Sequence, residues 1–180
     1  KKIVKENIVH LKINEDRRIE EGFVKLIKYT IKFCIRNKMK LILPCKRDKK
    51  YLPGAHKLEI EFLKRNLTKE EFDYAQSNLL EKNRYNFTSY RAVLDSKITI
   101  GTYTTLLRDK LAMGGKILSC NLTKLDRYNF PVNGICTLNN CSYEEFEKRV
   151  LEIYSTPKEI FFSKMEKKPD YVMHFNKNHS

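Results

Sequence analysis

The hydrophobic positions of this chain follow two spacings, one typical of strands and one typical of helices. Residues 7–13 show the alternation and the β-branched content of a short strand. Between residues 19 and 34, apolar side chains recur every three or four positions, which predicts an amphipathic helix with one buried stripe. Residues 41–44 are continuously apolar and predict a buried strand. Strand, helix and strand in this order predict a right-handed βαβ unit.

The alternation of helices and strands continues through the middle of the chain. A helix is predicted over residues 58–67, and a capping box of Thr68 and Glu71 begins a second, shorter one. Residues 76–87 have no clear pattern, after which Thr88 or Ser89 is expected to cap a brief helix around residues 92–94.

The last third of the chain repeats the pattern with clearer boundaries. Strands are predicted over residues 97–101, 116–120 and 134–138, and a helix over residues 104–113 that Gly114 and Gly115 end. A capping box of Ser142 and Glu145 begins another helix, and Thr156-Pro157 begins the last.

Strands that are apolar on both faces and alternate with helices are typical of a parallel sheet covered on both sides. We therefore predict an α/β fold: a doubly wound, mostly parallel, Rossmann-like sheet of about six strands with helices on both faces. One domain is expected over residues 1–175, followed by a frayed tail at residues 176–180.

Composition narrows the class of protein further. The chain has 180 residues, 41% of them apolar, which fits one soluble domain. It has no apolar leader and no run long enough to span a membrane, so the expected location is the cytoplasm. Its five cysteines lack CxxC spacing, which predicts reduced, buried thiols and no metal site. Because the first residue is not Met, we expect the chain to be a piece of a longer protein.

The net charge of +14 is unevenly distributed. Residues 1–50 carry 16 basic and 6 acidic side chains. A concentrated positive field suits a phosphorylated ligand, a nucleic acid or an anionic membrane surface. Biased base composition in the gene is an alternative source of the lysine excess.

The strongest candidate site lies where the strand at residues 97–101 meets the next helix. Gly101 allows a close approach because it has no Cβ, and Thr102, Thr104 and Thr105 offer hydroxyl groups. The first turn of a helix also presents unpaired amides and partial positive charge. At the carboxyl end of a parallel strand these features predict a phosphate site. The plainer alternative is that Thr104 is only a helix cap and Gly101 only a turn residue.

Several charged residues are further candidates for this site. Asp109, near the start of the same helix, is placed to accept from ribose or sugar hydroxyls, or is an ordinary exposed aspartate. The basic residues Lys12 and Arg17 follow the first strand, and Lys46 and Arg47 follow the second. If the sheet is parallel, these loops share one edge with the Thr104 turn and can bind phosphate, although solvated loops are the alternative.

Catalytic groups are harder to assign. His56, in the 46–57 loop, is the one histidine that we consider as a base. The chain has no GxxxxGK[ST] loop and no GxGxxG, which argues against the commonest ATP and NAD sites.

The run Tyr90-Arg91, Asp95-Ser96, residues 101–106 and residues 112–118 resembles the C-terminal half of GT-B glycosyltransferases that build surface polysaccharides. The resemblance covers residues 85–175, and over residues 1–84 only the order of elements matches. It implies that Thr104 and Thr105 correspond to the family's Ser-Thr pair, which contacts the donor phosphates. Asp109 falls on the family's glutamate and is one methylene shorter.

The resemblance also implies a function. GT-B enzymes hold a nucleotide sugar between two domains, generally without a metal or other cofactor, and take the acceptor and the catalytic base from the N-terminal domain. We therefore expect a metal-independent glycosyltransferase donor-binding domain, incomplete on its own. Its implied partners are a nucleotide-sugar donor, a glycan or lipid-linked acceptor, an N-terminal GT-B domain and, peripherally, a membrane. The alternatives are a basic nucleic-acid or anionic-surface binding module, and half of a sugar-nucleotide epimerase.

Overall fold

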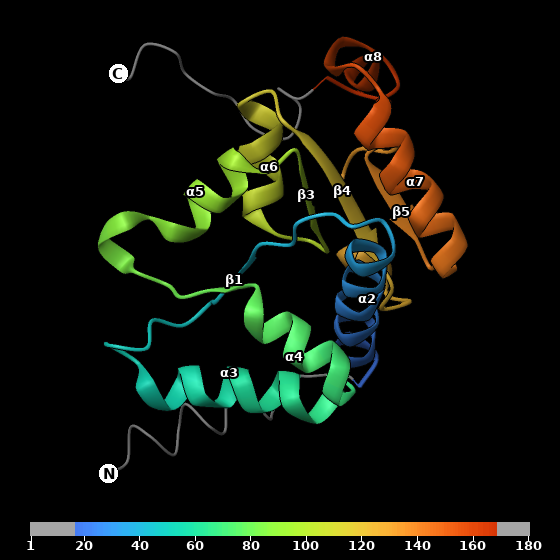
Figure 1. The fold of residues 1–180 in the computed structure, drawn as a ribbon. Helices are drawn as coiled ribbons and strands as arrows, with labels where there is room; N and C mark the ends of the chain where they lie inside the picture. The colour runs from blue at the N-terminus through green and yellow to red at the C-terminus, as the bar shows by residue number, and fades with distance from the viewer. Residues whose placement is uncertain (1–16, 169–180) are drawn as a thin grey trace.

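A computed structural model describes residues 17–168 and shows a mixed α/β arrangement with two small parallel sheets (Figure 1). The α-helices are α2 (Arg17–Arg36), α3 (Pro53–Asn66), α4 (Lys69–Ser77), α5 (Thr88–Asp95), α6 (Thr105–Ala112), α7 (Tyr143–Ser155) and α8 (Lys158–Ser163). The strands are β1 (Leu43–Pro44), β2 (Leu79–Leu80), β3 (Ile98–Gly101), β4 (Lys116–Asn121) and β5 (Thr137–Asn139). Two short 3-10 helices cover Arg84–Asn86 and Asp126–Tyr128.

The larger sheet has the order β3-β4-β5, and all its strands are parallel. Its central strand is covered on both faces, because five consecutive residues from Ile117 to Asn121 are buried. Figure 1 shows α5 and α6 on one side of this sheet and α2 and α7 on the other. The predicted α/β class with parallel strands and helices on both faces is thus confirmed.

The smaller sheet pairs β1 with β2 in parallel and lies beside α3 and α4 (Figure 1). Instead of one sheet of about six strands, the described residues form two sheets with five short strands. The amides of Leu43 and Cys45 donate to the Asn78 and Leu80 carbonyls of the β2 segment at 3.0 and 2.9 Å, so Pro44 faces the other side of β1, where it has no amide to pair with a further strand. The strand predicted at residues 7–13 lies outside the described residues.

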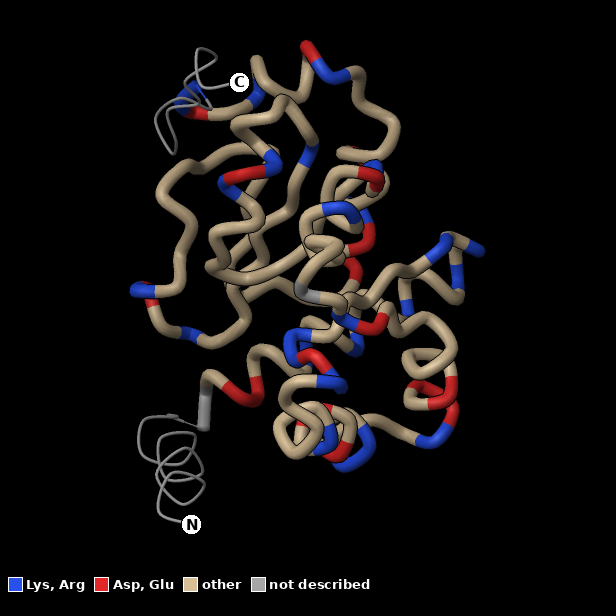
Figure 2. The backbone as a smooth tube through the Cα atoms, turned by 90° about the vertical axis from the view of Figure 1, so that its left-hand side faces the viewer, with Lys and Arg blue, Asp and Glu red and all other residues tan. Residues whose placement is uncertain are grey.

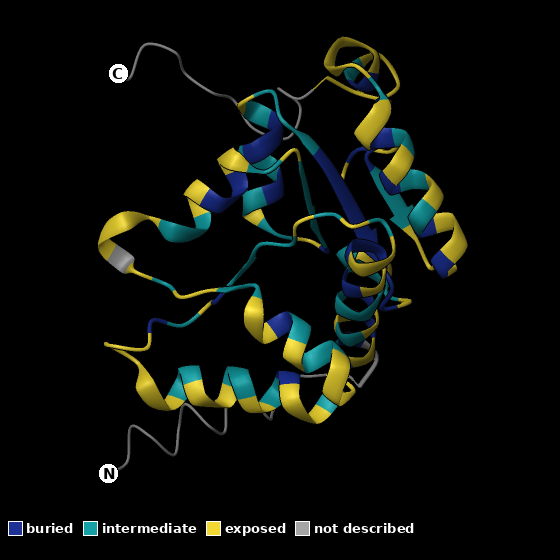
Figure 3. Ribbon diagram, in the orientation of Figure 1, coloured by how far each residue is buried: buried dark blue, intermediate teal, exposed yellow. Residues whose placement is uncertain are grey.

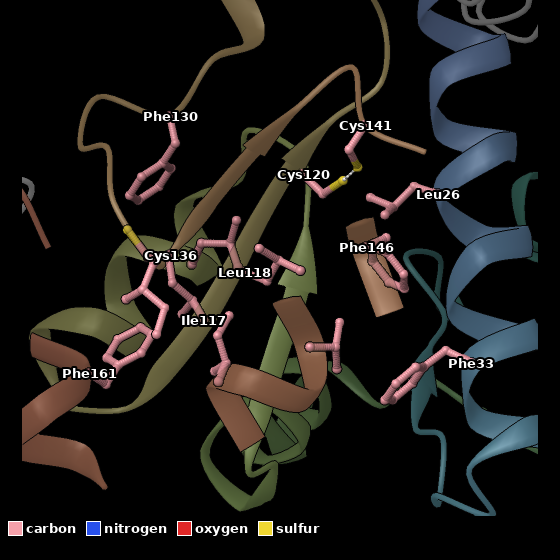
Figure 4. Close-up of a cluster of buried hydrophobic side chains, with 14 of the residues drawn as sticks. Leu26, Phe33, Ile117, Leu118, Cys120, Phe130, Cys136, Cys141, Phe146 and Phe161 are labelled. Carbon is pink, nitrogen blue, oxygen red and sulfur yellow. Dashed lines mark hydrogen bonds between the residues drawn. The ribbon is translucent and has the colours of Figure 1, made fainter. Parts of the chain in front are cut away.

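The main core surrounds β4. Figure 4 shows Ile117, Leu118, Phe146 and Phe161, all fully buried, gathered around the sheet. A second, smaller cluster consists of Ile31, Leu63, Leu67 and Ala75, between α2, α3 and α4. Figure 3 shows that the two regions differ in burial: β4 is buried (dark blue), whereas α3 and α4 have many exposed residues (yellow).

Helix α2 belongs to both clusters. Leu26, Phe33 and Cys34 pack in the main core, whereas Ile31 packs in the smaller one. The helix lies very close to the segment after β4: a Cβ added at Gly22 would come within 2.7 Å of the Thr123 backbone nitrogen. Only glycine permits this approach.

Helix boundaries agree with the sequence where the signal is local. The capping boxes of Thr68 with Glu71 and Ser142 with Glu145 are both formed. Gly114, with φ of 72°, follows the end of α6 as predicted.

The predicted cap of α5 is wrong. Phe87, in the left-handed conformation with φ of 48°, precedes this helix, and no side chain caps it. The Thr88 hydroxyl instead accepts from the Asn83 amide at 2.9 Å, because the preceding turn competes for it.

Three basic side chains each bind a group of backbone carbonyls. Lys110 Nζ donates to the carbonyls of Val93, Leu94 and Ser96. Lys116 Nζ donates to those of Ile153, Tyr154 and Thr156, and Arg149 donates to those of Gly134, Ile135 and Thr137. The first two groups lie at the C-terminal ends of α5 and α7, where carbonyls lack intrahelical partners and favour cations, whereas Arg149 binds the segment that leads into β5. Part of the positive charge is therefore structural.

Two predictions from composition can also be compared with the structure. All five cysteines are buried and free, as expected, with Cys120 Sγ and Cys141 Sγ 3.7 Å apart (Figure 4). Over residues 17–168, no helix combines the length and the apolar character that crossing a membrane requires.

Candidate functional site

The bend between β3 and α6 is the site that the sequence favours. β3 ends at Gly101, and α6 begins after Thr104, close to the predicted boundaries. Thr102 is only 4% exposed, and its hydroxyl donates to the Cys120 carbonyl at 3.3 Å. Its own carbonyl accepts from Ser119 Oγ at 3.4 Å. Thr102 therefore links the bend to β4, and its hydroxyl proton is donated within the fold and not to a ligand.

Thr104 and Thr105 are placed differently from Thr102. Thr104 is half-buried and its hydroxyl does not cap the helix, while Thr105 is exposed. Among the described residues, no hydrogen bond reaches the amides of Thr105 or Leu106, as expected in a first helical turn. A Cβ at Gly101 would come within 3.3 Å of Thr104 Cγ2, so glycine lets Thr104 lie over the strand end. Two hydroxyls and two amides are thus available at the bend.

The sequence alone leaves two interpretations for Arg108, pairing with phosphate or pointing to water, and favours water; in the structure Arg108 adds positive charge to the bend. Its guanidinium lies 4.8 Å from the centroid of the Tyr103 ring and donates to the Tyr103 hydroxyl. Arg108 is four residues after Thr104, so both occupy the same side of α6.

Asp109 lies on α6, beside Tyr90 of α5, and is not an ordinary exposed aspartate. Its Oδ2 atom is buried and has no hydrogen-bond partner among the described residues. The negative charge of the carboxylate, then burial and a hydrogen bond between the two side chains, raise the pKa of Tyr90, which lies on α5. An unpaired buried acceptor is costly, and a ligand hydroxyl would satisfy it.

The basic loop after β1 does not contact this bend. The amides of Lys46 and Arg47 donate to the two carboxylate oxygens of Glu59 on α3, at 2.7 and 3.1 Å. The Lys46 carbonyl accepts from Lys82 Nζ at 3.1 Å. Within residues 17–168, no hydrogen bond or ion pair joins Lys46 or Arg47 to the bend. The described contacts therefore do not bring Lys46 and Arg47 to the bend, where the sequence predicts them.

The remaining candidates do not complete the bend either. Arg17 is the first residue of α2, and Lys12 lies outside the described residues. His56 is not in a loop as predicted but in the first turns of α3, which begins at Pro53, and it lies beside Cys45 and Glu59. The sequence reasoning missed this group because Cys45 is distant in the chain. The signal was a helical His-x-x-Glu pair following a cysteine at a strand end.

No known protein family, curated protein or solved structure matches this chain. The relation to GT-B glycosyltransferases therefore remains a hypothesis, to be argued from the geometry of the bend and tested directly.

Proposed function

We propose that the β3–α6 bend binds the phosphate of a nucleotide sugar, and that the chain is the donor-binding domain of a GT-B type glycosyltransferase. The observation that supports this most is the open first turn of α6 at the carboxyl end of a parallel strand. Ligands of α/β proteins bind at this edge of the sheet, and helix N-termini favour anions. The Thr104 hydroxyl, which does not cap the helix, is part of the same surface.

The described groups suit a phosphate. The amides of Thr105 and Leu106 and the hydroxyls of Thr104 and Thr105 are donors, and Arg108 supplies a full positive charge. Charge-assisted hydrogen bonds of this kind are stronger than neutral ones. In glycosyl transfer, the same donors would stabilise the negative charge that develops on the leaving phosphate, so the proposed transfer needs no metal ion.

The proposed sugar or ribose contact is Asp109. Its buried, unpaired Oδ2 would accept from a ligand hydroxyl. A donor bound between α5 and α6 would then have its phosphate at the bend and a hydroxyl one helical turn away.

The catalytic base remains outside this site. His56 belongs to a separate cluster on α3, so it is not proposed as the base for a sugar held at the bend. We therefore propose that the base and the glycan or lipid-linked acceptor come with an N-terminal domain. Cytoplasmic location and a peripheral membrane contact are parts of the same proposal.

The rival function, binding of nucleic acid, rests on the net charge of +14. Three of the cations involved serve backbone carbonyls. Figure 2 shows basic and acidic positions interleaved along the described helices. This arrangement favours the donor site over a continuous basic surface.

Thermal unfolding with a panel of UDP, GDP, CMP and dTDP sugars tests the proposal. A sugar nucleotide present at 100 times its dissociation constant would stabilise the fold by about 2.7 kcal/mol. The Thr104→Ala/Thr105→Ala double variant and Arg108→Ala are each expected to lose most of this effect. The matched control is Lys97→Ala, whose ammonium also lies on a tyrosine, 4.8 Å from the centroid of the Tyr154 ring, but just before β3, at the edge of the sheet opposite to the bend.

Two results would contradict the proposal. One is stabilisation by short DNA or RNA duplexes, steeply dependent on salt, with no response to any sugar nucleotide. The other is a sugar-nucleotide effect that survives all changes at Thr104, Thr105 and Arg108.

A further inference from the structure

A second cluster of reactive side chains lies in the half of the molecule that contains β1 and β2. Cys45 follows β1 directly, and His56 and Glu59 lie one turn apart on α3. One ligand-type atom from each of these residues lies within 4.8 Å of the other two. The cluster borders a cavity of about 230 Å³ that is also lined by Lys49, Ile60, Gln76, Leu79 and Glu81.

His56 is incompletely paired. Its Nδ1 atom is buried and has no hydrogen-bond partner among the described residues. A buried polar atom without a partner costs free energy unless something satisfies it. A metal ion at the cluster would take the lone pair of an imidazole nitrogen.

The backbone around the cluster is already fixed. Glu59 accepts from the amides of Lys46 and Arg47 and so holds the loop after β1 against α3. The Cys45 amide donates to the Leu80 carbonyl at 2.9 Å. A carboxylate oxygen has a second lone pair, so Glu59 can keep these hydrogen bonds and still bind a metal. Such outer contacts orient metal ligands in known sites.

We propose that Cys45, His56 and Glu59 bind a zinc ion. This site does not depend on the function proposed for the bend. Thiolate, imidazole and carboxylate are all zinc ligands, and the two anionic ligands would neutralise the charge of Zn²⁺. Tetrahedral zinc places ligand atoms about 3.3–3.8 Å apart. Side-chain movements of about 1 Å would therefore close the site around the ion.

The fourth coordination position would face the cavity. Glu81, which follows β2 and lines that cavity, is one candidate for this position, and a water molecule is the other. Glu81 also pairs with Lys49 at 3.3 Å, and both side chains are exposed. Such an ion pair is weak, so Glu81 can leave Lys49 to bind the metal. Hard cations such as Mg²⁺ and Ca²⁺ prefer all-oxygen sites and do not suit this set.

A nucleophilic role for Cys45 fits the structure less well. The side chain is fully buried. Burial, and then the negative charges of Glu59 and Glu81, raise the pKa of the Cys45 thiol. Catalytic cysteines require a lowered pKa and access to substrate. The same negative surroundings attract a cation, and metal binding would displace the thiol proton.

The zinc ion would act as a structural link. It would join the end of β1 to the first turns of α3, in the half with only a small hydrophobic cluster. Binding energy at such a site adds directly to folding stability.

The test uses the full chain, stripped of metal with a chelator and titrated with Zn²⁺ or Co²⁺. We expect one ion per chain and a higher melting temperature with zinc. With Co²⁺ we expect the intense visible bands of a tetrahedral site and thiolate-to-cobalt absorption in the near ultraviolet. Cys45→Ser and His56→Gln are each expected to weaken binding by more than about 100-fold, because loss of a direct ligand exceeds the cost of losing an outer contact.

Matched controls separate this site from accidental binding. Cys34→Ala removes another buried cysteine, Glu61→Gln removes an exposed carboxylate from the same helix, and His174→Gln/His179→Gln removes the histidines of the C-terminal tail. All three should bind zinc as the parent does. Should Cys45→Ser fail to fold, the loss of the cobalt bands in His56→Gln decides the question, because His56 is only partly buried. Absence of a thiolate band in the parent, or unchanged binding in His56→Gln, would overturn the proposal.

Discussion

The two halves of this molecule are stabilised in different ways. Around β3-β4-β5, twenty buried apolar residues form one cluster, and basic side chains serve the carbonyls at helix ends. Around β1-β2, only four of the described residues form the buried cluster, and a thiol, an imidazole and a carboxylate lie together beside it. The comparison indicates that burial of apolar side chains contributes more to stability in the first half, whereas the proposed zinc ion would contribute its binding energy in the second.

The largest expected effect comes from removing a core side chain in the larger half. Phe146→Ala should destabilise the fold by about 3–5 kcal/mol, because the phenyl ring is fully buried against α2 and β4. Leu63→Ala, in the smaller cluster, should cost about 2 kcal/mol, since its partly exposed neighbours can relax into the space. Urea unfolding of both variants measures the difference. Equal or reversed costs would remove the distinction between the two halves.

A smaller loss of stability is expected when Lys110, a buried cation of the larger half, is replaced. Lys110→Met keeps most of the buried aliphatic chain but leaves three carbonyls at the end of α5 without their donor. We expect a loss of about 2–3 kcal/mol in the free energy of unfolding. The control is Lys148→Met on α7, an exposed residue whose replacement should change stability by less than about 0.5 kcal/mol. Similar values for the two variants would show that the carbonyl contacts contribute little.

The smallest effect concerns buried thiols and the direction of a pH dependence. Burial raises the pKa of Cys34 and of Cys136 from 9.0 to about 11. Between these values the folded chain keeps protons that the unfolded chain loses, so stability should fall as the pH rises from about 8 to 9.5, by on the order of 1 kcal/mol. Unfolding curves at both pH values measure the slope, and Cys136→Ala should reduce it. A stability that rises over this range would contradict the assignment.

What the sequence predicted correctly depends on neighbouring residues. The capping boxes at Thr68 and Ser142 and the turn at Gly114 are set within a few positions of the chain, and each formed as expected. The predicted side-chain cap of α5 was wrong because the Thr88 hydroxyl accepts instead from the amide of Asn83, five residues earlier. The separation of β1-β2 from the larger sheet depends on tertiary packing, which the spacing of apolar residues does not encode.

The candidate site shows the same limit. The position of the β3–α6 bend was predicted, since a strand, a glycine and hydroxyl residues before a helix are a local pattern. The use of Thr102 by β4 was not, because its acceptor, the Cys120 carbonyl, is 18 residues away. The grouping of Cys45 with His56 and Glu59 likewise requires the fold of the loop between β1 and α3.

Helix α2 connects the two halves mechanically. Leu26 and Ile31 are on one helix but pack in different clusters. At Gly22 the same helix lies so close to Thr123 that no side chain would fit between them. Neither cluster can release this helix without opening the other, so the described residues are expected to melt in a single cooperative transition. An ion held beside β1 would accordingly slow amide hydrogen exchange in β4 as well as in its own surroundings.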